Sequence, residues 1–73
     1  MKTRFLESLV AVAECGSMAG AARRLNLTPA GVNQQIRALE NEIGTRLLVR
    51  SGRAVRPTPA AASILDRARS VLG

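Results

Sequence analysis

Hydrophobic residues recur at three- and four-residue steps in four separate stretches of this 73-residue chain, and this spacing predicts four amphipathic helices. The first helix is expected over residues 4–14. Gly16 and Ser17 separate it from the second, because glycine accepts the left-handed conformation found at helix ends and serine caps a helix start. The second helix is short and ends at Leu25.

A third helix is expected after a tight turn. Asn26 tolerates the positive φ of a helix terminus, and Thr28 followed by Pro29 is an N-cap with proline at the first helical position. The helix runs from Pro29 to about Ile43, and its buried stripe is Val32, Ile36, Leu39 and Ile43. Its opposite face is polar or small and is free to contact another molecule; it carries Ala30, Asn33, Gln34, Arg37 and Asn41.

The pattern changes after Gly44. Residues 47–50 predict a short strand, residues 51–53 a turn and residues 54–57 a returning strand, which together form a β-hairpin. The cap-plus-proline signal recurs at residues 58–59 and begins a fourth helix, whose apolar stripe is Ala61, Ile64, Leu65, Ala68, Val71 and Leu72. A small three-helix domain offers no obvious cover for this stripe, which favours a dimer. Packing on the first helix of the same chain is the alternative.

Charge narrows the choice of partner. The chain has 11 Lys and Arg against 5 Asp and Glu, a net charge of +6, and Lys2 is its single lysine. Arginine favours phosphate and planar oxygen groups, because its guanidinium fork binds two oxygens at once. No acid lies between residues 45 and 57, where Arg46, Arg50, Arg53 and Arg56 gather. This balance indicates nucleic acid first and a membrane surface second, and a merely soluble basic protein is the alternative.

Missing residue types exclude several classes of function. The chain has no His, one Cys and few acids, so it holds neither a ligand set for structural zinc nor the usual acid–base pair. We therefore expect no enzyme activity, no metal and no cofactor in these residues. Cys15 cannot form an internal disulfide, which fits the cytoplasm. Glu7 and Glu14 interrupt the apolar start of the chain, so no signal peptide or membrane span is expected.

Two helices joined by a short turn, the second with a polar outer face, predict a helix-turn-helix, which places one helix in the major groove of DNA. The basic hairpin beside it predicts a wing along the sugar-phosphate backbone or in the minor groove. The expected fold class is therefore mostly α, a winged helix-turn-helix of three helices and a short hairpin.

Individual residues suggest roles in such a contact. Asn33 and Gln34 each carry the donor and acceptor that pick out adenine, although they also suit an ordinary solvated helix face. Ser17 and Thr28, at the starts of the second and third helices, are candidate phosphate clamps as well as plain caps.

The wing arginines Arg50, Arg53 and Arg56 are candidates for phosphate or minor-groove contact, and a charged β-edge that discourages aggregation is the other interpretation. Two rival functions remain. An RNA-binding module is disfavoured because Phe5 is the only aromatic residue, and single-stranded RNA readers need aromatic platforms. A protein-interaction module would use the fourth helix.

Residues 21–40, Ala-Ala-Arg-Arg-Leu-Asn-Leu-Thr-Pro-Ala-Gly-Val-Asn-Gln-Gln-Ile-Arg-Ala-Leu-Glu, and residues 44–48, Gly-Thr-Arg-Leu-Leu, resemble the N-terminal DNA-binding domain of LysR-type transcriptional regulators. Arg-Ser-Gly-Arg at residues 50–53 and Pro-Thr at residues 57–58 reinforce the resemblance, which spans essentially the whole chain.

The resemblance implies sequence-specific binding of double-stranded DNA by a bacterial regulator, with a recognition helix at about residues 28–43. It divides the chain into a winged helix-turn-helix at residues 1–58 and a linker helix at residues 59–73, which pairs with its copy in a homodimer. A small-molecule co-inducer would bind only the family's C-terminal domain, which these residues do not include. The implied DNA contacts are Ser17, Met18, Thr28, Pro29, Ala30, Asn33, Gln34, Arg37, Arg50, Ser51, Gly52 and Arg53.

The chain departs from the family pattern at several positions. Gly31 stands where the family usually has Ala, and glycine inside a helix costs about 1 kcal/mol. Our hypothesis is that Gly31 permits close approach to the second helix or to a phosphate. Asn33 and Gln34 replace a commoner Ser and Arg, which changes the expected base preference.

Overall fold

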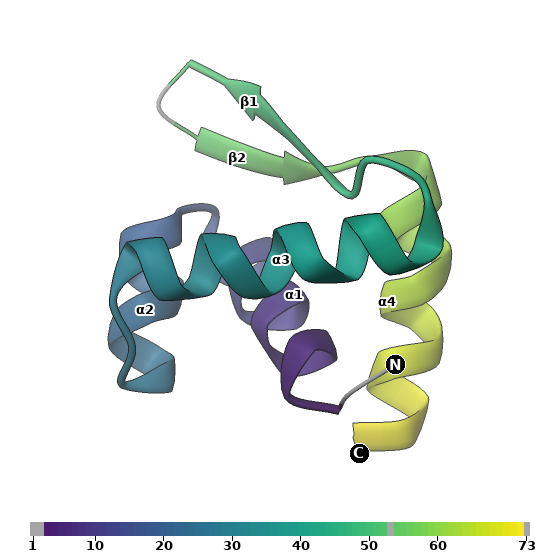
Figure 1. The fold of residues 1–73 in the computed structure, drawn as a ribbon, viewed down its shortest axis with the longest axis horizontal. Coiled ribbons are helices and arrows are strands. Elements are labelled where there is room, and N and C mark those ends of the chain that lie inside the picture. The colour runs from purple at the N-terminus through teal and green to yellow at the C-terminus, as the bar shows by residue number, and fades with distance from the viewer. Residues whose placement is uncertain (1–2, 53, 73) are drawn as a thin grey trace.

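The computed structural model describes residues 3–52 and 54–72, with the side chains of all of these except residues 71 and 72. The elements follow the expected order, namely α1 (Thr3–Cys15), α2 (Met18–Leu25), α3 (Pro29–Ile43), β1 (Leu48–Ser51), β2 (Ala54–Pro57) and α4 (Pro59–Leu72). In Figure 1, α3 crosses the molecule with α1 behind it, α2 at one end, α4 at the other and the hairpin above. The expected winged helix-turn-helix fold is confirmed.

Local capping fixes where α2 and α3 begin and end. Ser17 is extended, with φ −155°, and its hydroxyl accepts the backbone N–H of Gly20 at 3.0 Å. Thr28 caps α3 in the same way, accepting the N–H of Gly31 at 3.0 Å. Asn26 adopts the left-handed conformation, with φ 60°, and ends α2. These caps confirm the boundaries expected from the sequence, since each satisfies backbone groups that a helix end leaves without partners.

The core lies where α1, α2 and α3 meet. Leu9 and Val12 of α1 pack with Val32, Ile36 and Leu39 of α3, and each is at most 1% exposed. The stripe predicted for α3 is confirmed at these three positions, and only its last member, Ile43, is half-buried. Burial of this stripe turns the opposite face of α3 outward.

The hairpin is a two-stranded antiparallel sheet with Leu48 opposite Pro57 and Ser51 opposite Ala54. Its first strand begins one residue later than expected, because the fully buried Leu47 serves as an anchor. The backbone N–H of Leu47 donates to Glu40 of α3, and its carbonyl accepts from Thr58.

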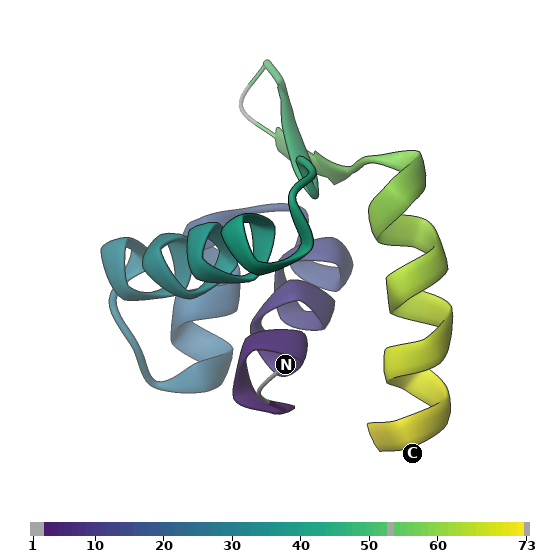
Figure 2. The same ribbon diagram turned by 45° about the vertical axis from the view of Figure 1, so that its right-hand side comes forward.

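Helix α4 packs against α1 of the same chain, which corrects one expectation. Ala61, Leu65 and Ala68 are 0%, 3% and 2% exposed, so the stripe does have cover within the chain at these positions. The reason is that α4 turns back beside α1 after the hairpin (Figure 2). Ile64 is half-buried, and the side chains of Val71 and Leu72 lie outside the described residues. No described helix is long and apolar enough to cross a membrane.

Candidate nucleic-acid interface

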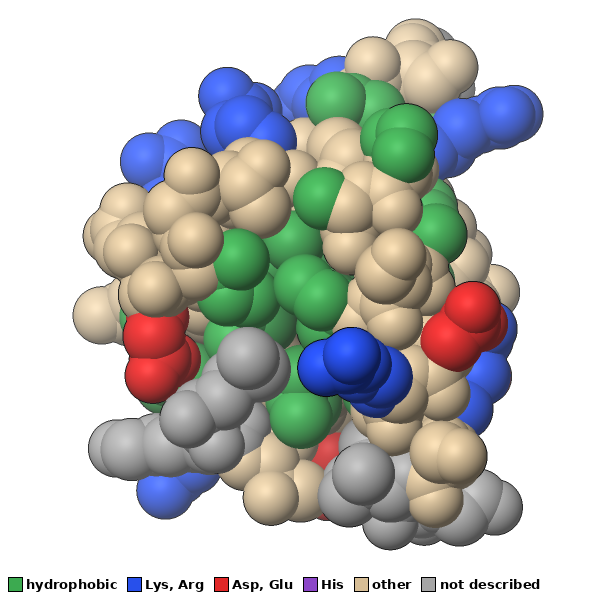
Figure 3. All heavy atoms as spheres, turned by 90° about the vertical axis from the view of Figure 1, so that its right-hand side faces the viewer, with side chains coloured by type: hydrophobic (Ala, Val, Ile, Leu, Met, Phe, Trp, Pro, Cys, Tyr) green, Lys and Arg blue, Asp and Glu red, His purple; other side chains and the backbone are tan. Residues whose placement is uncertain are grey.

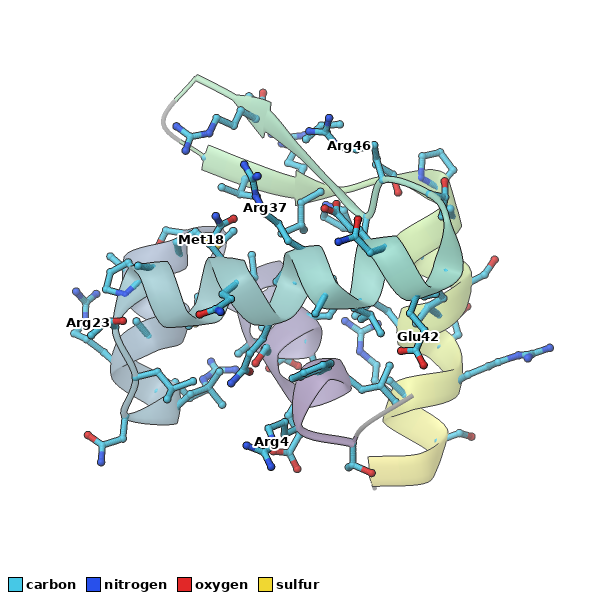
Figure 4. All side chains as sticks on the ribbon, viewed as in Figure 1. Arg4, Met18, Arg23, Arg37, Glu42 and Arg46 are labelled. Atoms are coloured by element: carbon cyan, nitrogen blue, oxygen red, sulfur yellow. The ribbon has the colours of Figure 1, made fainter. Side chains whose placement is uncertain are left out.

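The outward face of α3 is the first component of the site. Ala30, Gln34, Arg37 and Asn41 are exposed on it, and Asn33 is half-buried. In Figure 4 the side chain of Arg37 extends from α3 toward the hairpin. The face is therefore bounded on one side by the hairpin.

An open groove with a volume of about 380 Å³ separates α3 from the hairpin. Helix α3 contributes Asn33, Ile36, Arg37, Glu40 and Asn41 to its lining, and α2 contributes Met18. The hairpin and the segment before it contribute Arg46, Leu48, Val49, Arg50 and Val55. Residues far apart in the sequence thus form one groove lined by polar and apolar side chains.

The groove is positively charged. Arg37, Arg46 and Arg50 line it, and among its described lining residues Glu40 is the only acid. Arginine nitrogens can donate to phosphate oxygens in pairs, and asparagine amides can both donate and accept. Such a surface suits a polyanion that also presents hydrogen-bonding edges.

The carboxylate of Glu40 makes its contacts within the protein. Its Oε2 accepts the backbone N–H of Leu47 at 2.8 Å and lies 3.9 Å from Nε of Arg46, and the Glu40 side chain is 17% exposed. The Arg46 side chain is 80% exposed, so the ion pair leaves most of its guanidinium accessible. Glu40 therefore joins α3 to the base of the hairpin, and the three arginines of the lining still leave the groove with a net positive charge.

The starts of α2 and α3 offer further donors. The hydroxyls of Ser17 and Thr28 accept N–H groups of their own helices, so the hydroxyl hydrogen of each stays available to donate. Pro29 at the start of α3 is exposed, as is Thr28. Free backbone N–H groups and the positive end of the helix dipole favour anions at both places.

A family model described as "Bacterial regulatory helix-turn-helix protein, lysR family" matches residues 3–62, which is most of the chain. The chain belongs to the lysR family. The resemblance to this family that the sequence predicts is thereby confirmed, and the matched residues include α1, α2, α3 and the hairpin.

Curated relatives of the chain are described as HTH-type transcriptional regulators. The chain is 46% identical over 72 residues to the HTH-type transcriptional regulator TfdS of Cupriavidus pinatubonensis, covering 99% of this chain and 24% of TfdS. It is 42% identical over 72 residues to the HTH-type transcriptional regulator TcbR of Pseudomonas sp. strain P51, again covering 99% and 24%. The chain thus spans about a quarter of the length of these lysR-family relatives.

Solved structures of lysR-family proteins superpose closely on this chain. The crystal structure of the CbnR_DBD–DNA complex is 42% identical, with a TM-score of 0.92 over 99% of this chain and 83% of that chain. The BenM_DBD/benA site 1 DNA complex is 36% identical, with a TM-score of 0.92 over 99% of this chain and 81% of that chain.

The structure brings several predicted contact residues of this lysR-family domain together. Met18, Asn33, Arg37 and Arg50 all line the groove. Pro29, Ala30 and Gln34 are exposed on the N-terminal half of α3. Thr28 is exposed at its N-cap, and Ser17 is half-buried at the N-cap of α2.

The remaining predicted contacts lie on the wing. Ser51 and Gly52 are exposed at the hairpin tip, where Gly52 has φ 64°. Arg56 is exposed on β2 but does not line the groove. Arg53 lies outside the described residues.

The hypothesis that Gly31 permits close approach to α2 is wrong. A Cβ at Gly31 would meet only Oγ1 of Thr28, at 3.1 Å, apart from its own helix and its chain neighbours. No atom of α2 comes within 4 Å of that position. The second half of the hypothesis, approach to a phosphate, stays a prediction.

Sequence reasoning left Arg46 and Glu40 out of the candidate site. Arg46 was counted in the basic hairpin, but its place at the groove depends on how the segment before β1 packs on α3. Glu40 carries no periodic signal of its own, and its contact with Leu47 spans seven residues and the end of a helix. Among the described residues no group of three or more His, Cys, Asp or Glu side chains gathers as a metal site would require.

Proposed function

We propose that this chain binds double-stranded DNA sequence-specifically, as the DNA-binding domain of a lysR-family bacterial transcriptional regulator. The observation that carries the proposal is the groove between α3 and the hairpin, where polar amides and three arginines meet. The relatives whose titles record complexes with DNA support it, since their structures superpose on essentially the whole chain.

In this proposal α3 enters the major groove, which at about 12 Å in width admits one helix. Asn33 and Gln34 read base edges, and Ala30 and Pro29 allow close approach because they are small or compact. Arg37 stands nearer the hairpin, where it can meet a phosphate or a base. Base readout thus depends on the outer face of α3.

Affinity comes from a second set of groups. Arg46, Arg50 and the hairpin tip follow the sugar-phosphate backbone or the minor groove, and the starts of α2 and α3 offer backbone N–H donors to phosphates. Neutralised phosphates release counterions, so binding weakens as salt rises. Binding and specificity are therefore separable by mutation.

The experiment has two stages. Duplexes bound by the chain are selected from a random pool, and the affinity for the best duplex is compared with that for its single strands and for RNA of the same sequence. The proposal expects one preferred duplex. Equal binding to single strands or RNA would favour a basic RNA-binding module, and no nucleic-acid binding would favour a protein-interaction module.

Two variants then separate the roles. Asn33→Ala should change which base pair is preferred, by about 1–3 kcal/mol at one position. Arg50→Ala should weaken binding to all duplexes and reduce the slope of log affinity against log salt by about one. An Asn33→Ala protein that keeps the parent's preference would remove the readout role of Asn33.

We propose further that the regulator is a homodimer that pairs through α4. Ala61, Leu65 and Ala68 are buried against their own chain, so the pairing surface must use the other sides of α4. Figure 3 shows hydrophobic side chains at the centre of the face on the α4 side of the molecule, and Ile64 of α4 is half-buried, which leaves part of it free to contact a partner. Sedimentation of the chain over a concentration series tests the pairing, and Ile64→Glu on α4 should shift it toward monomer.

A further inference from the structure

One polar pair, the buried Ser8 and the half-buried Gln35, joins α1 to α3 beside the hydrophobic core. Ser8 of α1 is 1% exposed and is the only buried polar residue in the described part of the chain. Its hydroxyl donates to Oε1 of Gln35 on α3 and also lies 3.1 Å from the carbonyl oxygen of Arg4. Every other fully buried side chain described at this interface is hydrophobic.

Gln35 sits next in the sequence to the two proposed base readers. Successive residues of an α-helix are about 100° apart around the axis, because one turn takes 3.6 residues. Gln35 points inward to α1, whereas Gln34 is exposed and Asn33 lines the groove. The contact of Gln35 with Ser8 therefore bears on the direction in which the helix presents the positions of Asn33 and Gln34.

The apolar neighbours do not fix that direction as tightly. Val32, Ile36 and Leu39 pack through non-directional contacts, and hydrophobic cores tolerate repacking with small shifts of their elements. A hydrogen bond requires a narrow range of distance and angle, and a buried polar group loses free energy when its partner moves away. We expect rotation of α3 about its axis to strain this bond before it exposes a hydrophobic side chain.

We propose that Ser8 and Gln35 are positioning residues that set the base specificity of α3. They do not contact DNA themselves. They keep α3 from rotating about its axis, so that Asn33 and Gln34 face the base edges in the geometry that hydrogen bonds require. The inference rests on the proposed function, because it concerns how the same face discriminates among duplexes. It assigns a role in recognition to α1, the helix behind the recognition helix (Figure 1).

The test removes the pair without leaving a buried polar group. Ser8→Ala combined with Gln35→Met keeps the length of the residue 35 side chain and makes the contact apolar. Replacing both partners of a buried hydrogen bond is nearly neutral for stability, whereas removing one is not. We therefore expect the double variant to melt close to the parent and Ser8→Ala alone to melt lower.

Discrimination is measured as the ratio of the Kd values for a one-base-pair mismatch and for the selected duplex. In the double variant we expect this ratio to fall about three- to tenfold, because a base contact with poorer geometry discriminates less between the correct and the wrong base pair. Binding to a random duplex should not change. Ala11→Gly on α1 is the control, since it destabilises a buried, apolar position and should leave the ratio unchanged.

Parent-like discrimination by the double variant would overturn the inference and leave the proposed function intact. If the parent chain itself bound all duplexes alike, the proposed function would fail, and this inference with it. If the double variant does not fold, the discrimination ratio of each single variant is compared with that of Ala11→Gly. Each protein is then measured at the same number of degrees below its own melting temperature. A discrimination ratio equal to that of Ala11→Gly would then overturn the inference.

Discussion

The recognition helix and the wing lie on either side of one groove, but they are held in place differently. Helix α3 is fixed by a continuous buried stripe, with Ile36 and Leu39 at most 1% exposed. The wing has two strands of four residues each, and Leu48 is the only buried residue among those described in them. Hydrogen bonds hold it instead. At its base Glu40 accepts the backbone N–H of Leu47 and the hydroxyl of Thr58 donates to the carbonyl of Arg46, and within β2 the N–H of Val55 donates to the carbonyl of Gly16.

This difference matches the two tasks proposed for the site. Base readout requires side chains placed to within a fraction of an ångström, and on α3 the packed core and the hydrogen bond between Ser8 and Gln35 together hold them. Phosphate contact tolerates more variation, because the attraction between charges falls slowly with distance. We therefore expect core changes to abolish binding through unfolding and changes at the wing base to act locally.

The largest expected effect is on the recognition-helix side. Leu39→Ala leaves a cavity beneath α3 and should reduce the free energy of unfolding by about 2–5 kcal/mol, a large part of the total for a small domain. Urea denaturation followed by circular dichroism measures the loss. Leu27→Ala is the control, because Leu27 is 42% exposed and should change stability little. Equal losses in the two variants would contradict a core-held α3.

A smaller effect is expected where α3 meets the wing. Glu40→Ala leaves the buried backbone N–H of Leu47 without its acceptor, which should cost about 1–3 kcal/mol. Amide hydrogen exchange at Leu47 and along β1 should accelerate, while exchange in the middle of α3 changes less. Glu40→Gln retains an acceptor oxygen and should behave nearly as the parent. Uniform acceleration across α3 would show that the two regions are not held separately.

Thr58 gives a third test, at the junction of wing and α4. Its hydroxyl donates to the carbonyl of Arg46 at 2.7 Å and accepts the N–H of Ala61 at 3.2 Å. Thr58→Val removes both bonds at nearly constant volume, and we expect a loss of about 1 kcal/mol in thermal denaturation. Thr58→Ser should restore the parent value. A Ser variant as unstable as the Val variant would mean that the methyl group, rather than the hydroxyl, matters.

The smallest effect is expected at the start of α3. Gly31→Ala should stabilise the chain by less than about 1 kcal/mol, because the gain in helix propensity is reduced by the 3.1 Å contact with Oγ1 of Thr28. Calorimetry measures the shift in melting temperature. A stability gain accompanied by weaker DNA binding would support close approach of this backbone to a phosphate. A clear loss of stability would show that the Thr28 side chain cannot move aside for the added methyl group.

The parts predictable from the sequence are those decided within a few residues. The Ser17 and Thr28 caps, the left-handed Asn26 and the three-to-four spacing of Val32, Ile36 and Leu39 each act locally, and the structure confirms them. The outer face of α3 follows directly, because the residues opposite a buried stripe must face solvent.

The parts not predictable from the sequence depend on contacts between distant segments. Whether Ala61 and Leu65 are buried within the chain depends on the direction that the chain takes after the hairpin. The sequence pattern of an apolar helical stripe is the same whether the stripe packs within its own chain or on a partner chain. The contact of Ser8 with Gln35 spans 27 residues, and no pattern in the sequence pairs them. For the same reason the Arg46 side of the groove required the three-dimensional structure.

One backbone contact has a thermodynamic consequence for any ligand of this surface. The N–H of Val55 in β2 donates to the carbonyl of Gly16, 3.1 Å away in the loop before α2. This bond joins the start of α2 to the wing strand, which are the two ends of the surface. The segment between them, which includes α3, therefore forms a closed loop. A ligand that spans both ends meets a framework assembled in advance. A preassembled framework lowers the free energy that binding must use to order the protein, and a polyanionic ligand gains entropy from the counterions that it releases.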